Sequence, residues 1–160
     1  MNEQTFTIRP AERRDIPRLL ALLTQVNNVH HDIRPDLFVE NKTKYDAGDL
    51  ADMLGREDAP VFVCEDGAGF VCGYLFAVVR ERRGHNLTGG RSFYIDDLCV
   101  DGSCRGAGIG GRLLAHAAAH AKALGCREIL LNVWEGNDPA LRFYRNKGFT
   151  PRSHLLELEI

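Results

Sequence analysis

Hydrophobic and polar residues alternate with the two-residue period of a β-strand in several short stretches of this chain. Residues 5–9 alternate in this way, and two apolar runs at residues 60–64 and 70–80 are joined by the turn EDGAG. A short glycine-containing turn between two such runs predicts an antiparallel hairpin. A further strand is predicted over residues 91–100. Three consecutive strands without a helix between them indicate a meander.

Other segments carry apolar residues at the three- and four-residue spacing of a helix. This spacing predicts helices that begin near Asp15, Ala47, Gly110 and Asp138. By contrast, residues 27–45 are polar and have few periodic apolar positions, so they are predicted to form a long loop after the first helix.

Two more strands complete the expected sheet. Residues 128–134 follow a strand, a loop and a helix, so they are predicted to run parallel to the strand that ends at Val100. Residues 153–160 end in the alternating sequence LLELEI and are predicted to return to the sheet. We therefore expect an α+β fold, an α/β sandwich whose mixed, mostly antiparallel, twisted sheet has one parallel strand pair and helices on both faces.

Length and composition limit the classes of protein that fit. A chain of 160 residues without repeats or low-complexity stretches is expected to form a single domain over residues 1–160. The formal net charge of −2 argues against a nucleic-acid partner. The chain lacks the roughly 20 unbroken apolar residues of a membrane span, and its first residues lack a signal pattern, so no membrane partner and a cytoplasmic location are expected.

The five cysteines do not suggest a disulfide framework or a zinc ribbon. Their number is odd and they form no CxxC pair, so reduced thiols are expected. His116 and His120 are four residues apart on a predicted helix, but the zincin glutamate and a third ligand at a suitable distance are missing. We therefore expect no metal.

The glycine-rich stretch YIDDLCVDGSCRGAGIGG, residues 94–111, has the most informative pattern in the chain. It predicts a strand, a loop and the beginning of a helix. The first backbone N–H groups of a helix have no intrahelical partner, and the helix dipole adds positive charge there, so this junction can hold phosphate oxygens. Arg105 at the entrance of the loop would add a fixed charge with several donors.

Two known phosphate-binding motifs fit this stretch less well. GAGIGG has the spacing GxGxxG of a dinucleotide-binding Rossmann domain, and Glu135 follows at a suitable distance. However, that motif normally lies in the first strand-helix unit of a long alternating fold, whereas here it follows a meander. A Walker loop is excluded because the chain has no Gly-Lys-Ser or Gly-Lys-Thr sequence.

The arrangement as a whole resembles the GNAT superfamily of N-acetyltransferases. The resemblance rests on RGAGIG, on the later segments ILLNVWEGN and ALRFYRNKGF, and on an opening TIRPAERRDIPRLLALL that is similar to the first strand and helix of the family. Arg105, Gly108 and Gly110 meet the signature Q/R-x-x-G-x-G/A. The resemblance implies the acyl-CoA N-acyltransferase fold, with acetyl-CoA as cosubstrate in the gap between two splayed parallel strands.

The resemblance also implies which residues contact acetyl-CoA. Backbone groups of one strand would bind the pantetheine arm, the glycine loop would bind the diphosphate, Asn137 would touch the arm, and Phe143 would pack near the cofactor. The strand residues are Leu98, Cys99 and Val100, and the loop residues are Arg105, Gly106, Ala107, Gly108, Ile109, Gly110 and Gly111.

Acetyl transfer to an amine needs a base that deprotonates the amine and an acid that protonates the leaving thiolate. Tyr144 matches the usual general acid of the family, and Asp96 aligns with an acidic residue that serves as base in some relatives, here acting through a water molecule. Strand alternation sends Asp96 and Asp97 to opposite faces, so at most one faces the cleft directly. Which of the two faces the amine stays open.

The acceptor is expected to be a primary amine, either of a small molecule or of a protein N-terminus. Candidate acceptor-binding residues are His30, His31 and Phe38 in the predicted loop, together with Asp97. Dimerisation through the C-terminal strand is common in folds of this family, so the resemblance implies a homodimer as one hypothesis. Two alternatives remain: a non-catalytic acyl-CoA-binding or sensor module, which Tyr144 argues against, and a fragment of a nucleotide-dependent oxidoreductase, which the predicted topology argues against.

Overall fold

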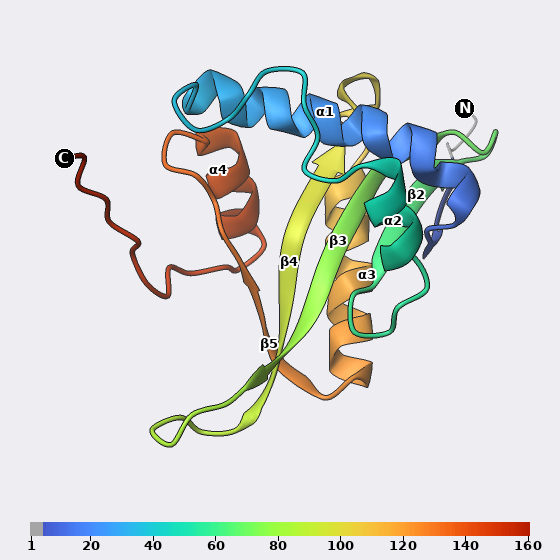
Figure 1. The fold of residues 1–160 in the computed structure, drawn as a ribbon. Coiled ribbons are helices and arrows are strands. Elements are labelled where there is room, and N and C mark those ends of the chain that lie inside the picture. Colours follow the sequence, from blue (N-terminus) through green and yellow to red (C-terminus); the bar gives the residue numbers. More distant parts are fainter. Residues whose placement is uncertain (1–4) are drawn as a thin grey trace.

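The structure of the protein, a computed structural model, describes residues 5–160. Its strands form a five-stranded sheet in the order β1-β2-β3-β4-β5 (Figure 1). Consecutive neighbours pair in antiparallel fashion up to β4, and β4 and β5 are parallel. The strands are β1 at Phe6–Pro10, β2 at Val61–Asp66, β3 at Val71–Arg82, β4 at Gly90–Val100 and β5 at Cys126–Leu131.

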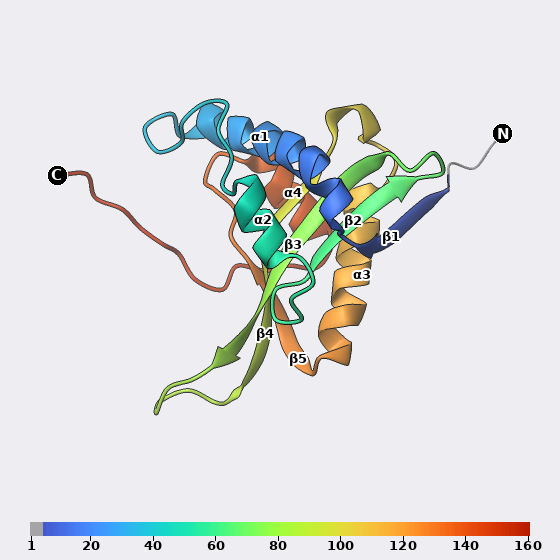
Figure 2. The same ribbon diagram turned by 45° about the vertical axis from the view of Figure 1, so that its right-hand side comes forward.

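Helices cover both faces of the sheet, which confirms the predicted fold class. The helices are α1 at Ile16–Ile33, α2 at Ala47–Met53, α3 at Ile109–Ala123 and α4 at Asp138–Asn146. Figures 1 and 2 show α1 and α2 across one face and α3 along the other. Alternate strand residues accordingly enter two cores: Val61 and Val63 of β2 pack with α1 and α2, whereas Phe62 and Cys64 pack with α3. Within residues 5–160, no helix is long and apolar enough to span a bilayer.

The first helix is longer than predicted, so the prediction of a loop from residue 27 onward was wrong for residues 27–33. Asn27 and Asn28 do not end α1, because their side chains bind the chain segment that returns over the helix. The Asn27 amide donates to the carbonyl of Val39 at 2.8 Å, and the Asn28 amide donates to the side chain of Asn41 at 2.9 Å. The polar stretch is therefore the outer end of a helix that is fastened to the following loop.

The predicted last strand was also wrong, because residues 153–160 pair with no strand within the described residues 5–160. They leave α4 and run away from the sheet as an extended segment (Figures 1 and 2). Glu157 in this segment binds Arg34 at the end of α1, with 2.6 Å between the closest nitrogen and oxygen. Alternation alone therefore predicted the extended conformation but not its partner.

The parallel strands β4 and β5 diverge at one end, as the resemblance implied. Their pairing runs from Arg91–Cys126 to Ile95–Leu131 and then stops. Beyond this point, residues 96–100 of β4 have no neighbouring strand on the β5 side in the part of the chain that the structure describes. The register between β3 and β4 also shifts here, from Phe76–Asp97 to Ala77–Ile95. Asp96 is thus the extra residue of a β-bulge, which bends a strand and re-aims its side chains.

Candidate active site

The glycine loop is fastened to the rest of the fold by Asp101, at the end of β4. The Asp101 carboxylate accepts a hydrogen bond from the backbone N–H of Ser103 at 2.8 Å and pairs with Arg18 of α1. The Ser103 and Arg18 contacts lower the pKa of Asp101 to about 2. Arg18 also donates to the carbonyl of Val71 at 3.0 Å. These contacts hold the short turn Gly102–Cys104 and set the direction in which the chain enters α3.

The loop itself leaves backbone accessible where a ligand would approach. Gly106 and Gly108 have φ values of +84° and +73°, which favour glycine, and open space lies on the side where a Cβ would stand. At Gly110, a Cβ would lie 3.2 Å from the ring of Phe143, so the absence of a side chain allows α4 to approach α3 closely. The result is an open beginning of α3 with its first N–H groups facing outward.

A cavity of about 550 Å³ lies over this loop, and it contains most of the predicted diphosphate-binding residues. Three predicted cofactor-binding residues do not line it. Ala107 packs toward the α3 core, the buried Cys99 thiol donates to the carbonyl of Leu22 at 3.5 Å, and Asn137 lines a second cavity described below. Lys147 of the segment after α4 also lines the cavity over the loop, and sequence reasoning missed this second cation. The lining residues are Leu98, Val100, Cys104, Arg105, Gly106, Gly108, Ile109, Gly110, Gly111, Phe143, Asn146 and Lys147.

This cavity fits the acetyl-CoA that the resemblance implies. Two cations, Arg105 and Lys147, stand beside the helix N-terminus, and this combination suits a diphosphate. The unpaired side of β4 at residues 98–100 begins at the same cavity, and its backbone groups can pair with the amides of a pantetheine arm. The two cations and the unpaired side of β4 all belong to one copy of the chain, so one copy is enough to form this cavity.

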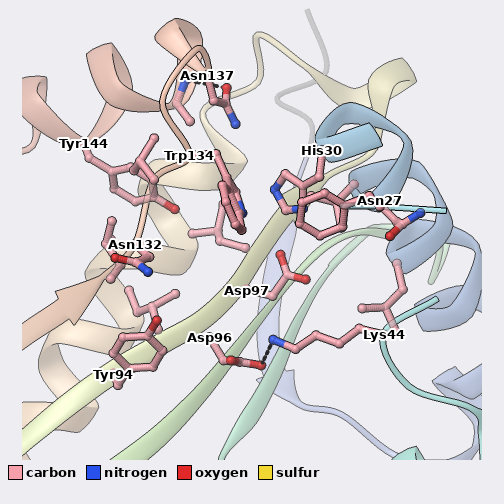
Figure 3. Close-up of a pocket in the computed structure, with 18 of the residues that line it drawn as sticks. Asn27, His30, Lys44, Tyr94, Asp96, Asp97, Asn132, Trp134, Asn137 and Tyr144 are labelled. Carbon is pink, nitrogen blue, oxygen red and sulfur yellow. Dashed lines mark hydrogen bonds and ion pairs between the residues drawn. The ribbon is translucent and has the colours of Figure 1, made fainter. Parts of the chain in front are cut away.

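A second cavity, of about 410 Å³, lies where β4 and β5 diverge (Figure 3). It is bounded by α1, the segment after α1, the middle of β4, the end of β5 and α4. It contains many of the predicted catalytic and acceptor-binding residues, namely Asp96, Asp97, Leu98, Asn137, Tyr144, His30 and Phe38. It also contains Asn27 and Lys44 from the segment 27–45, which was expected to line the acceptor side, and three residues that sequence reasoning missed, Tyr94, Asn132 and Trp134.

Both aspartates line this cavity, whereas alternation had predicted that they lie on opposite faces. The bulge at Asp96 removes the strict alternation at this point of β4. Asp96 is occupied, because one of its oxygens accepts hydrogen bonds from Lys44 Nζ at 2.8 Å and from the hydroxyl of Tyr45 at 2.7 Å. Burial raises the pKa of Asp97 to about 6, although the positive charge of Lys44 opposes this shift. One oxygen of Asp96 is therefore already engaged in two hydrogen bonds, whereas burial makes the carboxylate of Asp97 easier to protonate.

Tyr144 faces the same cavity from α4 (Figure 3). Burial and the negative charge of Asp97 raise its pKa above the ordinary value of 10.0, so the phenol keeps its proton at neutral pH. The helix is positioned by Asn137, whose side-chain oxygen accepts from the N–H of Ala140 at 3.4 Å. Asn137 is thus both the cap of α4 and part of the cavity wall.

Aromatic rings form the wall opposite Tyr144 and Asn132. The ring of Phe38 lies 5.2 Å from that of His30 and 5.2 Å from that of Trp134, measured between centroids. Burial, together with the charge of Lys44, lowers the pKa of His30, so its imidazole is uncharged at neutral pH. His31 does not line this cavity; its Nδ1 lies 2.8 Å from the carbonyl oxygen of Phe38 and fastens this segment to α1.

His116 and His120 lie away from both cavities. Their rings pack edge-on against Phe62, with centroid distances of 4.6 and 5.1 Å. In residues 5–160, no group of three or more His, Cys, Asp or Glu side chains is arranged to hold a metal ion. The two histidines are therefore part of the packing between α3 and β2.

Comparison with known proteins decides the family. The acetyltransferase (GNAT) family matches residues 24–149, which is most of the chain. The chain belongs to the GNAT family. Its GNAT relatives include a putative phosphinothricin acetyltransferase of Bacillus subtilis, which is 30% identical over 148 residues, or 90% of this chain and 83% of that protein.

Two further comparisons agree with this membership. Glucosamine 6-phosphate N-acetyltransferase 1 of Oryza sativa is 32% identical over 152 residues, which cover 94% of this chain and 84% of that protein. The crystal structure of a variant of the BH1408 protein from Bacillus halodurans superimposes with a TM-score of 0.91 at 28% identity, over 96% of this chain and 99% of that chain. The GNAT fold therefore extends over nearly the whole chain.

Proposed function

We propose that this GNAT chain transfers the acetyl group of acetyl-CoA to the primary amine of a small molecule, and that residues 1–160 act as one catalytic domain. The observation that carries the proposal is that Asp97 and Tyr144 line one cavity at the point where β4 and β5 diverge. Two relatives are named for phosphinothricin and glucosamine 6-phosphate, which both carry a primary amine. This supports an acceptor of that class.

Acetyl-CoA would supply the acetyl group as a thioester. Arg105, Lys147 and the first N–H groups of α3 would bind its diphosphate, with Gly106 to Gly111 allowing close approach. The backbone of Leu98, Cys99 and Val100 would pair with the arm, since that side of β4 has no strand neighbour. Asn137 and Phe143 would flank the arm from α4, because each lines one of the two cavities.

We assign the base to Asp97 instead of Asp96. Asp96 already accepts hydrogen bonds from Lys44 and Tyr45, which stabilise its charge and reduce its ability to take a proton. Asp97 has a pKa raised to about 6, close to the pH at which a general base works best. A water molecule between the amine and Asp97 remains part of the proposal, as it was for Asp96.

The proposed reaction begins when the neutral amine nitrogen attacks the thioester carbonyl carbon, and Asp97, through the water molecule, takes the proton that this nitrogen loses as the amide forms. A C–N bond forms, the C–S bond breaks, and the electron pair of that bond leaves on sulfur. Tyr144 then donates its proton to the sulfur, and the proton that Asp97 accepted is released to solvent, from which Tyr144 is reprotonated. The main-chain N–H groups near Leu98 and Cys99 are the candidate donors to the carbonyl oxygen.

Calorimetry combined with a thiol-release assay tests this function. We expect acetyl-CoA to bind in preference to NAD, and thiol release to depend on one of several amines offered, including phosphinothricin, glucosamine 6-phosphate and a peptide with a free N-terminus. Mass spectrometry should show the acetylated amine. Binding of acetyl-CoA without acetylation of any amine would instead favour the acyl-CoA-binding module, and equal binding of NAD would refute the acetyl-CoA site.

A further inference from the structure

Tyr74 of β3 is the largest fully buried side chain in the described part of the chain, and the proposed function does not use it. Its exposed fraction is 0%, and its hydroxyl has no hydrogen-bond partner within residues 5–160. A buried hydroxyl without a partner is unusual, because the group has lost its bonds to water and has gained none in return. The position of this hydroxyl therefore calls for an explanation.

The core around Tyr74 is almost entirely apolar. The ring packs edge-on against Phe76, with 4.9 Å between centroids, and its neighbour on β2 is Val63. The other buried members of this core are apolar side chains and the Cys99 thiol, which already donates to the carbonyl of Leu22. No buried side chain of this core, within the described residues, therefore offers the hydroxyl a strong partner.

The register of the sheet brings Asp97 within reach of this hydroxyl. Tyr74 pairs with Cys99 and Phe76 pairs with Asp97, and residues 97 and 99 share the face that α1 and α2 cover. Tyr74 and Asp97 are thus diagonal neighbours across two antiparallel strands. Such neighbours lie about 7 to 8 Å apart, a distance that an aromatic side chain can span.

The two side chains also affect each other's ionisation. Burial, followed by the negative charge of Asp97, raises the pKa of Tyr74, so the phenol keeps its proton at neutral pH. Burial raises the pKa of Asp97 as well, and Lys44 and the Tyr74 hydroxyl oppose this shift. A protonated phenol beside a carboxylate can serve it as a hydrogen-bond donor.

We propose that Tyr74 is a positioning residue of the base: its hydroxyl donates a hydrogen bond to one oxygen of Asp97 and leaves the other oxygen to face the acceptor. Figure 3 shows the Asp97 carboxylate directed into the acceptor cavity. The terminal torsion of an aspartate has a broad minimum, so the carboxylate can turn toward the hydroxyl without strain. This role rests on the proposed function, because it takes Asp97 as the base.

The hydrogen bond would set the pH range in which Asp97 works. A hydrogen bond to the charged form favours that form, so Tyr74 helps to keep Asp97 ionised at neutral pH despite its burial. Lys44 acts in the same direction through its charge, whereas Asp96 acts in the opposite direction. The titratable groups around Asp97 are His30 of α1, Lys44 and Tyr45 before α2, Tyr74 of β3, Tyr94, Asp96 and Cys99 of β4, and Tyr144 of α4. Tyr74 acts through a directed bond, so its effect can be removed without changing any charge.

A carboxyl ¹³C NMR titration of the full chain tests the contact without acetyl-CoA or acceptor, and Asp97→Asn identifies the resonance. Tyr74→Phe removes one oxygen and should raise the pKa of Asp97 from about 6 to about 7 or higher, because a hydrogen bond to a charged group is worth about one pKa unit or more. Tyr45→Phe is the matched control. It removes a hydroxyl that binds Asp96 at 2.7 Å, and it should leave the titration of Asp97 in place. An unchanged Asp97 pKa in Tyr74→Phe, or an equal rise in Tyr45→Phe, would overturn the proposal.

Unfolding measured across pH 3 to 8 distinguishes the hydrogen bond from packing. Below pH 3.8 Asp97 is protonated in the folded and the unfolded state, so the difference between Tyr74→Phe and wild type reports packing there. Between about pH 6 and 7 the variant keeps a proton that the wild type has lost, so its stability relative to wild type should fall in this window. In the Asp97→Asn background this fall should be absent. A difference that does not change with pH would show that Tyr74 acts in packing alone.

The pH profile of acetyl transfer separates this role from the proposed function. If Asp97 is the base, the acidic limb of kcat/KM should move in Tyr74→Phe by the same amount as the pKa measured by NMR. A pKa that moves while the acidic limb stays would refute Asp97 as the base, and with it the positioning role of Tyr74. An unchanged pKa together with an unchanged limb would refute the role of Tyr74 and leave the assignment of the base intact.

Discussion

Replacing Asp97 by Asn should make the protein more stable and much less active, and the two effects should share one pH dependence. Burial raises the pKa of Asp97 from 3.8 to about 6. At neutral pH the folded protein must therefore hold a carboxylate in a place that disfavours its charge. The unfolded chain does not carry this cost, because its aspartates are fully hydrated.

The size of the stability effect follows from the shift. Two pKa units or slightly more correspond to about 3 kcal/mol, since one unit is worth about 1.4 kcal/mol. Between pH 3.8 and 6 the folded state keeps a proton that the unfolded state has lost, so the stability of the wild type falls as pH rises through this window. Below pH 3.8 the carboxyl is protonated in both the folded and the unfolded state and does not lower the stability. Above pH 6 it is ionised in both states, and the folded state is destabilised by the full amount of about 3 kcal/mol.

Thermal or urea unfolding of both proteins across pH 3 to 8 measures this contribution. Asn does not ionise, so the difference in unfolding free energy between Asp97→Asn and wild type should grow by about 3 kcal/mol from the acidic to the neutral end. For a chain of this size this corresponds to roughly 6 to 12 °C in melting temperature. Any cost of burying the amide is independent of pH and cancels from the slope.

Activity provides the second measurement and a matched control. The kcat/KM of the wild type should fall below about pH 6, and Asp97→Asn should lose about a hundredfold or more at pH 7.5. Asp96→Asn removes a carboxylate one residue away, together with its contacts to Lys44 and Tyr45, and should keep the acidic limb of the pH profile. If Asp97→Asn keeps wild-type turnover, or if the acidic limb disappears only in Asp96→Asn, the assignment of the base is wrong.

Three further substitutions test other parts of the structure. Tyr144→Phe should lower kcat about a hundredfold or more with little change in acetyl-CoA affinity by calorimetry, and unchanged kcat would remove Tyr144 from the acid role. Arg105→Ala should weaken CoA binding but not that of a pantetheine fragment without the diphosphate; equal losses would indicate a structural role. Gly73→Ala should destabilise the fold by about 1 to 3 kcal/mol in urea unfolding, because its Cβ would lie 2.7 Å from the carbonyl oxygen of Cys99, and full stability would show that β3 and β4 can separate there.

Local patterns were sufficient to predict the sheet up to β5 and the glycine loop. The hairpin of β2 and β3 and the start of α3 depend on neighbouring residues, whose periodicity and turns are visible in the sequence. The order strand, loop, helix, strand also fixed the parallel direction of β5, because such crossovers are almost always right-handed and parallel.

The parts that could not be predicted depend on contacts between distant segments. The end of α1 is stabilised by bonds from Asn27 and Asn28 to residues 39 and 41, which no helix pattern reveals. The bulge at Asp96 arises from the register between β3 and β4, so strict alternation gave the wrong face for one of the two aspartates.

The residues of the second cavity, which would hold the acceptor, could likewise be predicted only in part from the sequence. Lys44 enters it from the loop after α1, and no pattern in residues 27–45 indicates which side chain of that segment reaches the cavity. Asn132 and Trp134 directly follow β5, and the rule that side chains gather beyond the carboxyl ends of parallel strands could have indicated them. The C-terminal segment was predicted as a strand of its own sheet because alternation does not specify which edge a strand joins.

The gap between β4 and β5 has a consequence for the lifetime of the protein in a cell. Without a ligand, residues 96–100 of β4 have no strand partner on the β5 side within residues 5–160, and apart from the Val100 carbonyl, which accepts from Gln25 at 3.0 Å, their backbone groups there could pair with another polypeptide, which promotes aggregation and degradation. If acetyl-CoA pairs with these groups as proposed, it binds the folded state alone and protects it. We then expect the abundance of the protein to follow the acetyl-CoA supply of the cell, so that starvation would reduce the number of enzyme molecules as well as the rate of each.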